Sequence, residues 1–196
     1  MGVKLVSASG GSVEINPPAT ASNFTATMPA GTGNVVVNGV NGSIVVGTAQ
    51  ATTSGTSIDF TGIPSWVERI TVIWNGVSTN GSSSPLVQLG TSGGVVTSGY
   101  GGSSSLIAST VTSQNFTTGF GERSQDAAAV RSGSWVITNV SGNIWVCAGV
   151  LGRSDGGNTS VTGGTVTLGG TLDRVRVTTV NGTDAFDAGS INILYE

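Results

Sequence analysis

The acidic residues are the side chains of this chain best suited to chemistry, because the sequence contains no histidine. Its absence excludes Ser-His-Asp and Cys-His catalysis, histidine-ligated zinc and the commonest general base at neutral pH. A pair of carboxylates can still hydrolyse a glycosidic bond. Asp184 and Asp187 are near neighbours in the sequence, and Asp59 would approach them if its stretch pairs with the C-terminal strands. Turn chemistry through local hydrogen bonds explains all three more simply, so we expect no catalytic residue.

Calcium is the metal that these carboxylates would suit best, and two stretches are candidates. One is Asp155-Gly156-Gly157-Asn158, and the other is Asp184 with Asp187. A calcium site takes about six to eight oxygen ligands, usually from a dense Asp/Asn pattern. Each stretch offers only one or two Asp residues, so an Asp-Gly turn is the better interpretation and we expect no metal site. Residues 99–102 are Gly-rich but lack the GxxxxGK[ST] pattern of a phosphate loop, and we expect no cofactor.

The composition excludes further classes of function. Charged residues make up 9% of the chain, against about 25% in ordinary domains. Lys and Arg together number 7 and the formal net charge is −3. Since no cluster of them can neutralise a row of phosphates, we expect no nucleic-acid binding. A chain with so few charges is poorly protected against association, and a symmetric assembly that buries much of its surface would solve that problem.

Cysteine content and hydropathy bear on the compartment. The chain has one cysteine, Cys147, which permits no disulfide within the chain. It lies on the strand face opposite Ile144 and Val146, and we expect a small buried apolar residue. No charged segment followed by an apolar run starts at Met1, so we expect that there is no signal peptide. We therefore expect the protein to be synthesised in the cytoplasm. No apolar run approaches the roughly 20 residues of a membrane-spanning helix, so we expect no membrane partner.

Alternating apolar and polar residues predict the strands that position these side chains. Val67–Trp74 places Ile70, Val72 and Trp74 on one face, and the turn signal Asn75-Gly76 follows. The stretch 172–177 repeats this spacing, and we interpret both as core strands of one antiparallel, jelly-roll-like β-sandwich. The other predicted strands are 85–89, 94–98, 133–140, 143–151, 159–168 and 190–195.

Turn residues predict how these strands connect. Ser141-Gly142 indicates a hairpin between its two flanking strands, and Gly169-Gly170 indicates a second hairpin. The stretch 99–131 is rich in Gly and Ser, and we expect it to form long, outward-facing loops. Only 126–130 has a short helical signal.

The chain divides into three parts. Residues 1–47 hold short extended segments that cannot form a core alone, and we expect a β-rich N-terminal attachment segment. Residues 48–54 are a predicted linker, and residues 55–196 form the predicted sandwich. The apolar residues expected to make the attachment are Val13, Ile15, Phe24, Met28, Val35 and Val37.

Aromatic residues are the remaining candidates for contact with a ligand. Of the 4 tryptophans, Trp74 shares its face with Ile70 and Val72 and is expected in the core. Trp66 follows Pro64-Ser65 and Tyr100 lies in a Gly-rich stretch, so both are predicted as exposed contacts with a carbohydrate or a protein. The simpler interpretation of Trp66 is a side chain packed at a subunit seam.

Several of these stretches carry a family resemblance. Residues 56–64, 69–81 and 86–90 resemble a domain of structural proteins of tailed bacteriophages and prophages, and residues 172–196 resemble the end of that domain. Residues 17–30 are similar to a segment that precedes many phage fibre and appendage domains. The resemblance implies a bacteriophage virion surface protein, located on the virion and made without a signal peptide in the host cytoplasm.

The resemblance leaves three functions open. The first is a homotrimeric capsid decoration (cement) protein, whose residues 1–47 bind the major capsid protein or another virion protein. The second is a tail fibre or spike tip that binds a host receptor such as a surface polysaccharide. The third, an enzyme that degrades that polysaccharide, is the weakest because no catalytic constellation is present. We favour decoration, because the chain has no long repetitive shaft of the kind a fibre carries.

Overall fold

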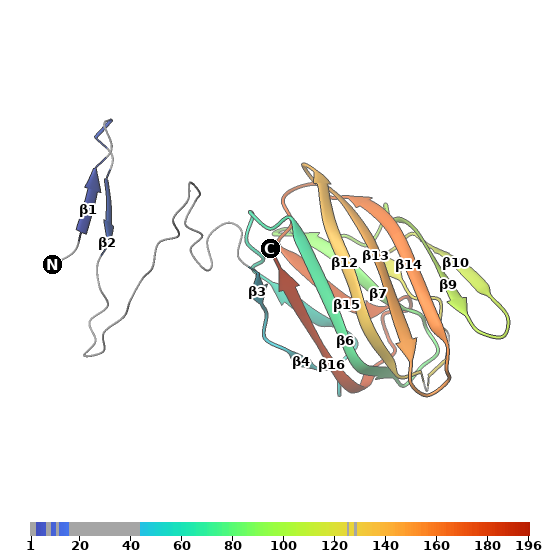
Figure 1. Cartoon of the computed structure of the whole chain (residues 1–196). Coiled ribbons are helices and arrows are strands. Elements are labelled where there is room, and N and C mark those ends of the chain that lie inside the picture. The colour runs from blue at the N-terminus through green and yellow to red at the C-terminus, as the bar shows by residue number, and fades with distance from the viewer. Residues whose placement is uncertain (1–2, 7–8, 11, 16–43, 125, 128) are drawn as a thin grey trace, which may run out of the picture. The chain divides into compact units, whose positions relative to one another are not determined.

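The computed structural model describes residues 3–6, 9–10, 12–15, 44–124, 126–127 and 129–196 (Figure 1). The chain forms two compact units, Met1–Val35 and Val36–Glu196. All regular secondary structure in the described residues is β-strand, and the strand pairs are antiparallel. The predicted all-β sandwich is therefore confirmed. Within the same residues, no helix is long and apolar enough to cross a membrane.

The first unit contains a short hairpin. Strand β1 (Val3–Val6) pairs with β2 (Ser12–Ile15), with Val3 opposite Ile15. Val13 and Ile15, two of the predicted attachment residues, belong to β2. The other four, Phe24, Met28, Val35 and Val37, lie outside the described residues.

Two sheets packed face to face form the second unit (Figure 1). The larger has nine strands, in which β4 (Gln50–Ala51) also pairs with β16. The order of the other eight is β10 (Thr112–Phe116), β9 (Gly101–Ile107), β14 (Thr159–Thr167), β13 (Ile144–Arg153), β12 (Arg131–Ser141), β6 (Arg69–Thr79), β16 (Phe186–Tyr195) and β3 (Val45–Val46).

The smaller sheet has five strands and covers one face of the larger sheet. Strand β8 (Gly94–Val95) pairs with β7. The order of the other four is β11 (Phe120–Gly121), β7 (Pro85–Thr91), β15 (Arg174–Thr179) and β5 (Ile58–Thr61).

The core fills the space between the sheets. Ile70, Val72 and Trp74 of β6 are buried, as are Val175 and Val177 of β15. The two similar stretches of sequence are therefore core strands of one sandwich, as predicted, and they lie in opposite sheets. Because burying an apolar side chain of this size contributes about 1.5–3 kcal/mol, their period of two fixes which face of each strand turns inward. Cys147 is also buried, which confirms its expected place.

The predicted turn at Asn75-Gly76 is wrong, because β6 continues through it to Thr79. Gly76 has a φ of 64°, and Gly189 on the paired strand β16 has a φ of 93°. The register between β6 and β16 shifts at Ala188. These bulges bend both strands and increase their twist while the pairing continues. An Asn-Gly pair therefore serves here as a bulge instead of a hairpin turn.

Two predicted connections also differ. Residues Ser141 and Gly142 do join β12 and β13 in a hairpin. Gly169-Gly170 instead joins β14 to β15, which lie in different sheets, so this predicted hairpin is wrong. The stretch 99–131 contains β9, β10 and β11 as well as loops, because strands of Gly, Ser and Thr give little apolar alternation to detect.

The end of the predicted attachment segment, which holds β3, and the predicted linker 48–54, which holds β4, both take part in the larger sheet. Residues of β3 pair with the C-terminal end of β16, and β4 pairs with Ser190 and Ile191 of the same strand. The side-chain amide of Gln50 donates to the carbonyl oxygen of Asp59 on β5 at 2.7 Å, which links the edges of the two sheets. Residues 44–51 thus run along the edge of the sandwich.

Candidate assembly surface

The acidic residues proposed for catalysis each have a structural partner. Asp59 accepts two hydrogen bonds from Arg176 on the neighbouring strand, at 2.7 and 2.8 Å. Asp184 accepts the backbone N–H of Ser83 at 2.8 Å and the side-chain amide of Asn181 at 2.6 Å. Arg176 and Ser83 are distant in sequence from the carboxylates they contact, so the expected local turn hydrogen bonds describe only the contact between Asn181 and Asp184.

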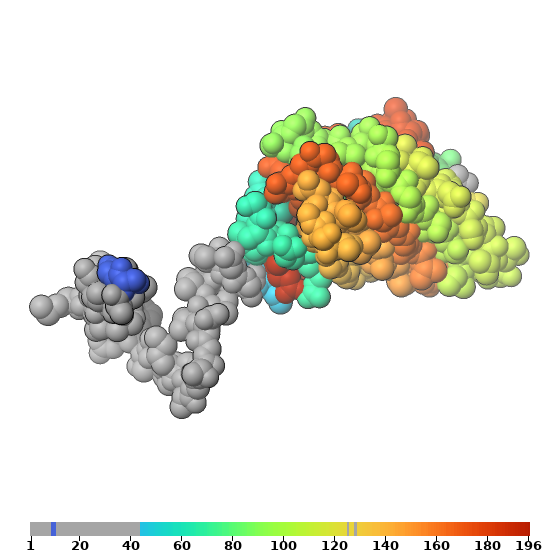
Figure 2. All heavy atoms as spheres, turned by 90° about the horizontal axis from the view of Figure 1, so that it is seen from above, coloured from blue at the N-terminus to red at the C-terminus, as the bar shows by residue number. Residues whose placement is uncertain are grey.

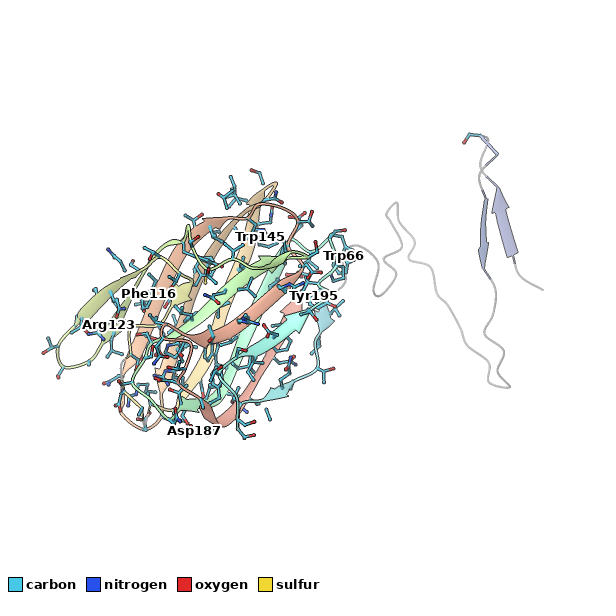
Figure 3. All side chains as sticks on the ribbon, turned by 180° about the vertical axis from the view of Figure 1, so that it is seen from behind. Trp66, Phe116, Arg123, Trp145, Asp187 and Tyr195 are labelled. Atoms are coloured by element: carbon cyan, nitrogen blue, oxygen red, sulfur yellow. The ribbon has the colours of Figure 1, made fainter. Side chains whose placement is uncertain are left out.

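The Asp side chains of the two candidate calcium stretches also have partners within the protein. The hydroxyl of Ser78 donates to Asp187, which lies beside the bulge of β16 (Figure 3). Asp155 forms an ion pair with Arg153 and accepts the backbone N–H of Val130 at 2.8 Å. Across the described residues, no three His, Cys, Asp or Glu side chains are grouped as a metal site would need.

A buried ion pair, which the sequence did not predict, joins Glu122 to Arg131. Both side chains are at most 1% exposed. Arg131 also donates to the carbonyl oxygen of Ala129 at 2.9 Å, and Ser160 donates to Glu122 at 3.1 Å. Burial raises the pKa of Glu122, and Arg131 and Ser160 oppose that shift. Every partner lies within the fold, so the pair holds the segment before β12 in place. In the sequence, an isolated charged residue that is buried cannot be told from one that is solvated, so no pattern predicts the burial of Glu122 and Arg131.

Trp66 is half-buried and packs against Tyr195, with ring centroids 6.0 Å apart (Figure 3). Arg69 and Glu196, which follow Trp66 and Tyr195 closely in the sequence, form an ion pair. A small hollow of about 220 Å³ adjoins them, lined by Ile44, Arg69, Thr71, Leu194, Tyr195 and Glu196. Trp66 is thus partly accessible, while its packing supports the edge of the core.

Tyr100 is buried, so its prediction as an exposed contact is wrong. Its hydroxyl accepts the backbone N–H of Leu89 at 2.7 Å and donates to the carbonyl oxygen of Val96 at 3.2 Å. Its ring packs edge-on against Phe120, with centroids 5.1 Å apart. Burial raises the pKa of Tyr100 to about 12. The flanking glycines indicate a loop, but the ring fills the core beneath it.

The outer face of the nine-stranded sheet, turned away from the five-stranded sheet, is the surface with the least ordinary composition. One row of paired residues crosses eight strands without a charge: Val46, Leu194, Thr71, Val136, Ala148, Gly163, Ser103 and Asn115. The adjacent row is also uncharged: Asn192, Ile73, Ser134, Val150, Val161, Ser105 and Ser113. Antiparallel sheets with one solvated face normally alternate apolar and polar residues, and the exposed valines of β12, β13 and β14 depart from that alternation.

Strand β13 shows the departure most clearly. Trp145, Cys147 and Leu151 point into the core, yet the intervening Val146 and Val150 are also apolar. Val146 is 37% exposed and Val150 46%. A strand that is apolar on both faces is typical of a strand covered on both sides. We call the exposed Val136, Val146, Val150 and Val161 the valine ridge.

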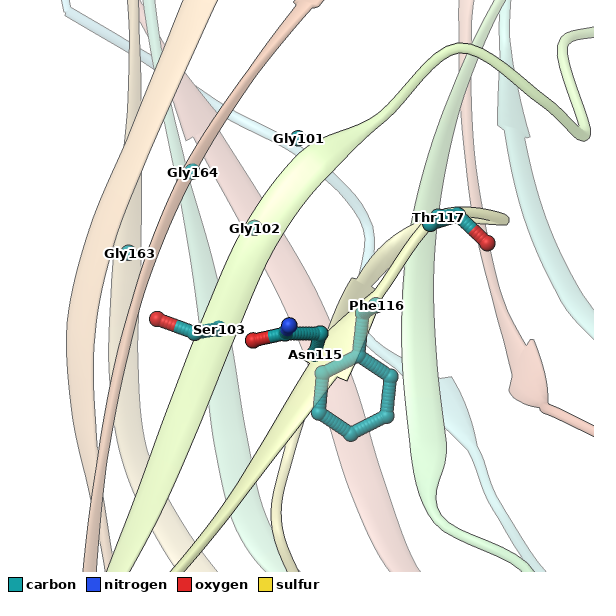
Figure 4. A pocket seen from close by; sticks show the side chains of 8 residues that line it. All are labelled: Gly101, Gly102, Ser103, Asn115, Phe116, Thr117, Gly163 and Gly164. Carbon is teal, nitrogen blue, oxygen red and sulfur yellow. The ribbon is translucent and has the colours of Figure 1, made fainter.

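A hollow is formed by β9, β10 and β14, the strands beyond β13 at one end of the larger sheet (Figure 4). Figure 2 shows the orange of β13 and β14 beside the yellow-green of β9 and β10. The volume of the hollow is about 430 Å³, and its lining is Gly101, Gly102, Ser103, Asn115, Phe116, Thr117, Gly163 and Gly164. We call it the glycine hollow. Glycine at facing positions of β9 and β14 leaves room where side chains would otherwise stand.

Comparison with protein families, with curated proteins and with solved structures finds no match to this chain.

Proposed function

We propose that this chain is a structural protein of a tailed-bacteriophage virion, and that it acts as a homotrimeric capsid decoration protein. The observation that carries the proposal is the outer face of the nine-stranded sheet, which exposes four valines and carries no charge along two neighbouring rows of residues. Exposed apolar patches of this kind mark contact surfaces between proteins. The resemblance of residues 56–90 and 172–196 to phage structural proteins supports a role on a phage virion.

The proposed role is mechanical. The segment 1–47 attaches the protein to the shell by adding backbone hydrogen bonds to neighbouring capsid subunits, as strands add to open sheet edges. Joining three copies gives each attachment segment a high effective concentration for the next, so that weak contacts together bind firmly. Each acidic residue considered for catalysis already has a partner in the fold, and we propose no enzymatic activity.

Deleting residues 2–43 tests the attachment segment. This deletion keeps β3 and β4, which pair with β16, and removes the hairpin of β1 and β2. We expect the shortened protein to keep its oligomeric state and to lose at least about tenfold in affinity for undecorated capsids. Pelleting with capsids and quantitative gel analysis measure this. Saturation of the shell with unchanged affinity would exclude the attachment role.

Copy number per particle separates decoration from the tail-fibre alternative. Decoration predicts many copies distributed over the shell lattice, whereas a fibre tip predicts a few copies at the tail. Mass spectrometry of purified virions and immunogold labelling measure number and location together. Labelling confined to the tail would replace decoration by receptor binding.

A further inference from the structure

The outer face of the nine-stranded sheet has two halves of opposite shape. Val146 and Val150 stand out from β13, with Val136 and Val161 on either side of it. Next to them, Gly163 on β14 pairs with Ser103 on β9, at the bottom of the glycine hollow. Exposed valines and the glycine hollow thus lie side by side on the outer face of the sheet.

The chemistry of this face selects the partner that covers it. A partner with charges at the contact would bury them without a counter-charge, which costs several kcal/mol per ion. The face itself offers no such counter-charge along its two central rows. An uncharged, apolar surface of the same kind avoids that cost, and another copy of this chain presents one.

Shape then decides how two copies meet. Packing the valine ridge on the ridge of a second copy would leave the glycine hollow empty on both. Packing the ridge into the hollow of the next copy fills the space and buries both halves. Such a contact joins two different patches, so it repeats from copy to copy and forms a closed ring when the rotation between copies divides a full turn.

We infer that the outer face of the nine-stranded sheet is the contact between three copies of this chain, with the valine ridge of each copy seated in the glycine hollow of the next. Three such sheets enclose a common axis as the sides of a triangular prism, and each side touches both of its neighbours. The inference deepens the proposed function, since it assigns the surface through which the proposed trimer forms.

Two substitutions in the full-length chain test the two halves separately. Val150→Lys places a charge on the ridge, and Gly163→Leu fills the hollow. A Cβ atom at Gly163 meets only the carbonyl oxygen of Cys147, at 3.7 Å, so a side chain can start there without displacing the backbone. The control is Val180→Lys, because Val180 is 47% exposed and follows β15 of the other sheet.

Sedimentation velocity gives the oligomeric state, and near-UV circular dichroism confirms the fold of each variant. We expect wild type and Val180→Lys to sediment as trimers, and Val150→Lys and Gly163→Leu as folded monomers at the same concentration. A monomeric wild type, or trimers in both test variants, would overturn the inference. A dimer lost only in Val150→Lys would also overturn it, in favour of ridge-on-ridge packing.

The outcome is separable from that of the proposed function. A trimer that does not bind capsids contradicts decoration and leaves this contact standing. A monomer that still decorates capsids contradicts the contact and leaves decoration standing.

Discussion

At the scale of single residues, the charged side chains in the described part of the chain serve mainly to form ion pairs within the fold. Arg176 holds Asp59 across two strands, and Arg131 holds Glu122 inside the fold. A buried ion pair adds little stability overall, because desolvation offsets the attraction between the charges. Removing one member of the pair is strongly destabilising, because the remaining charge stays buried without a partner.

Arg131→Met is therefore expected to lower the free energy of unfolding by about 3–5 kcal/mol at pH 7. Removing Arg131 also removes the main cause that opposes the raised pKa of Glu122. A carboxyl with a raised pKa in the folded state destabilises it as pH rises, so the loss should shrink towards pH 5. Urea unfolding at both pH values measures this.

The matched control for Arg131→Met is the double variant with Glu122→Gln, which removes the unpaired charge. Its stability at pH 7 should exceed that of the single variant. Equal stability of the two would show that lost packing of Arg131, and not the charge of Glu122, causes the effect.

For Asp155, we expect the free energy of unfolding to depend on pH with the opposite sign. Its hydrogen bond with Arg153 lowers the pKa of Asp155 to about 2. A lowered pKa stabilises the fold above the unfolded value of about 3.9, and this contribution disappears as pH falls towards 2. Because Asp155 is exposed, we expect Asp155→Asn to cost less than about 1 kcal/mol at pH 7 and clearly less at pH 2. Chemical unfolding across this range is the measurement, and a cost that is undiminished at pH 2 would contradict it.

At the scale of elements, the paired bulges of β6 and β16 shape the larger sheet. Gly76 and Gly189 occupy left-handed backbone conformations at facing positions. Beyond them, Thr79 still pairs with Phe186. The strands therefore stay joined through a bend that a regular ladder would not allow.

Gly189→Ala is expected to destabilise the sandwich by about 1–3 kcal/mol, because a φ of 93° is strained for alanine. Its Cβ would also collide with the backbone of Gly76. Gly152→Ala on β13 is the control, since its Cβ meets only the carbonyl oxygen of Ser132 at 3.9 Å, and it should change stability by less than about 0.5 kcal/mol. Thermal unfolding compares the two, and equal midpoints would contradict a strained bulge.

At the scale of the whole molecule, the sandwich buries one face of its larger sheet and leaves the valine ridge exposed on the other face. Layered folds bury each apolar sheet face against another layer. The five-stranded sheet covers the inner face, and the outer face with Val146 and Val150 has no such cover within the described residues. Assembly supplies a third layer in our proposal, which accounts for the low charge of the chain.

The amino-acid sequence by itself determined the strands of the core and which face of each of them turns inward. Trp74 and Cys147 lie in the core as their alternation predicts, because the free energy of burying apolar side chains acts on every second residue. The all-β class and the hairpin at Ser141-Gly142 follow from the same local preferences.

Only the tertiary structure decided which strands become neighbours and what each polar residue contacts. Asn75-Gly76 has the same local preference in a turn and in a bulge, and its pairing with β16 selects the bulge. Tyr100 and Glu122 are buried by strands distant in sequence. The valine ridge and the glycine hollow likewise combine β12, β13, β14, β9 and β10, whose order in the sheet depends on packing free energy summed over the whole fold.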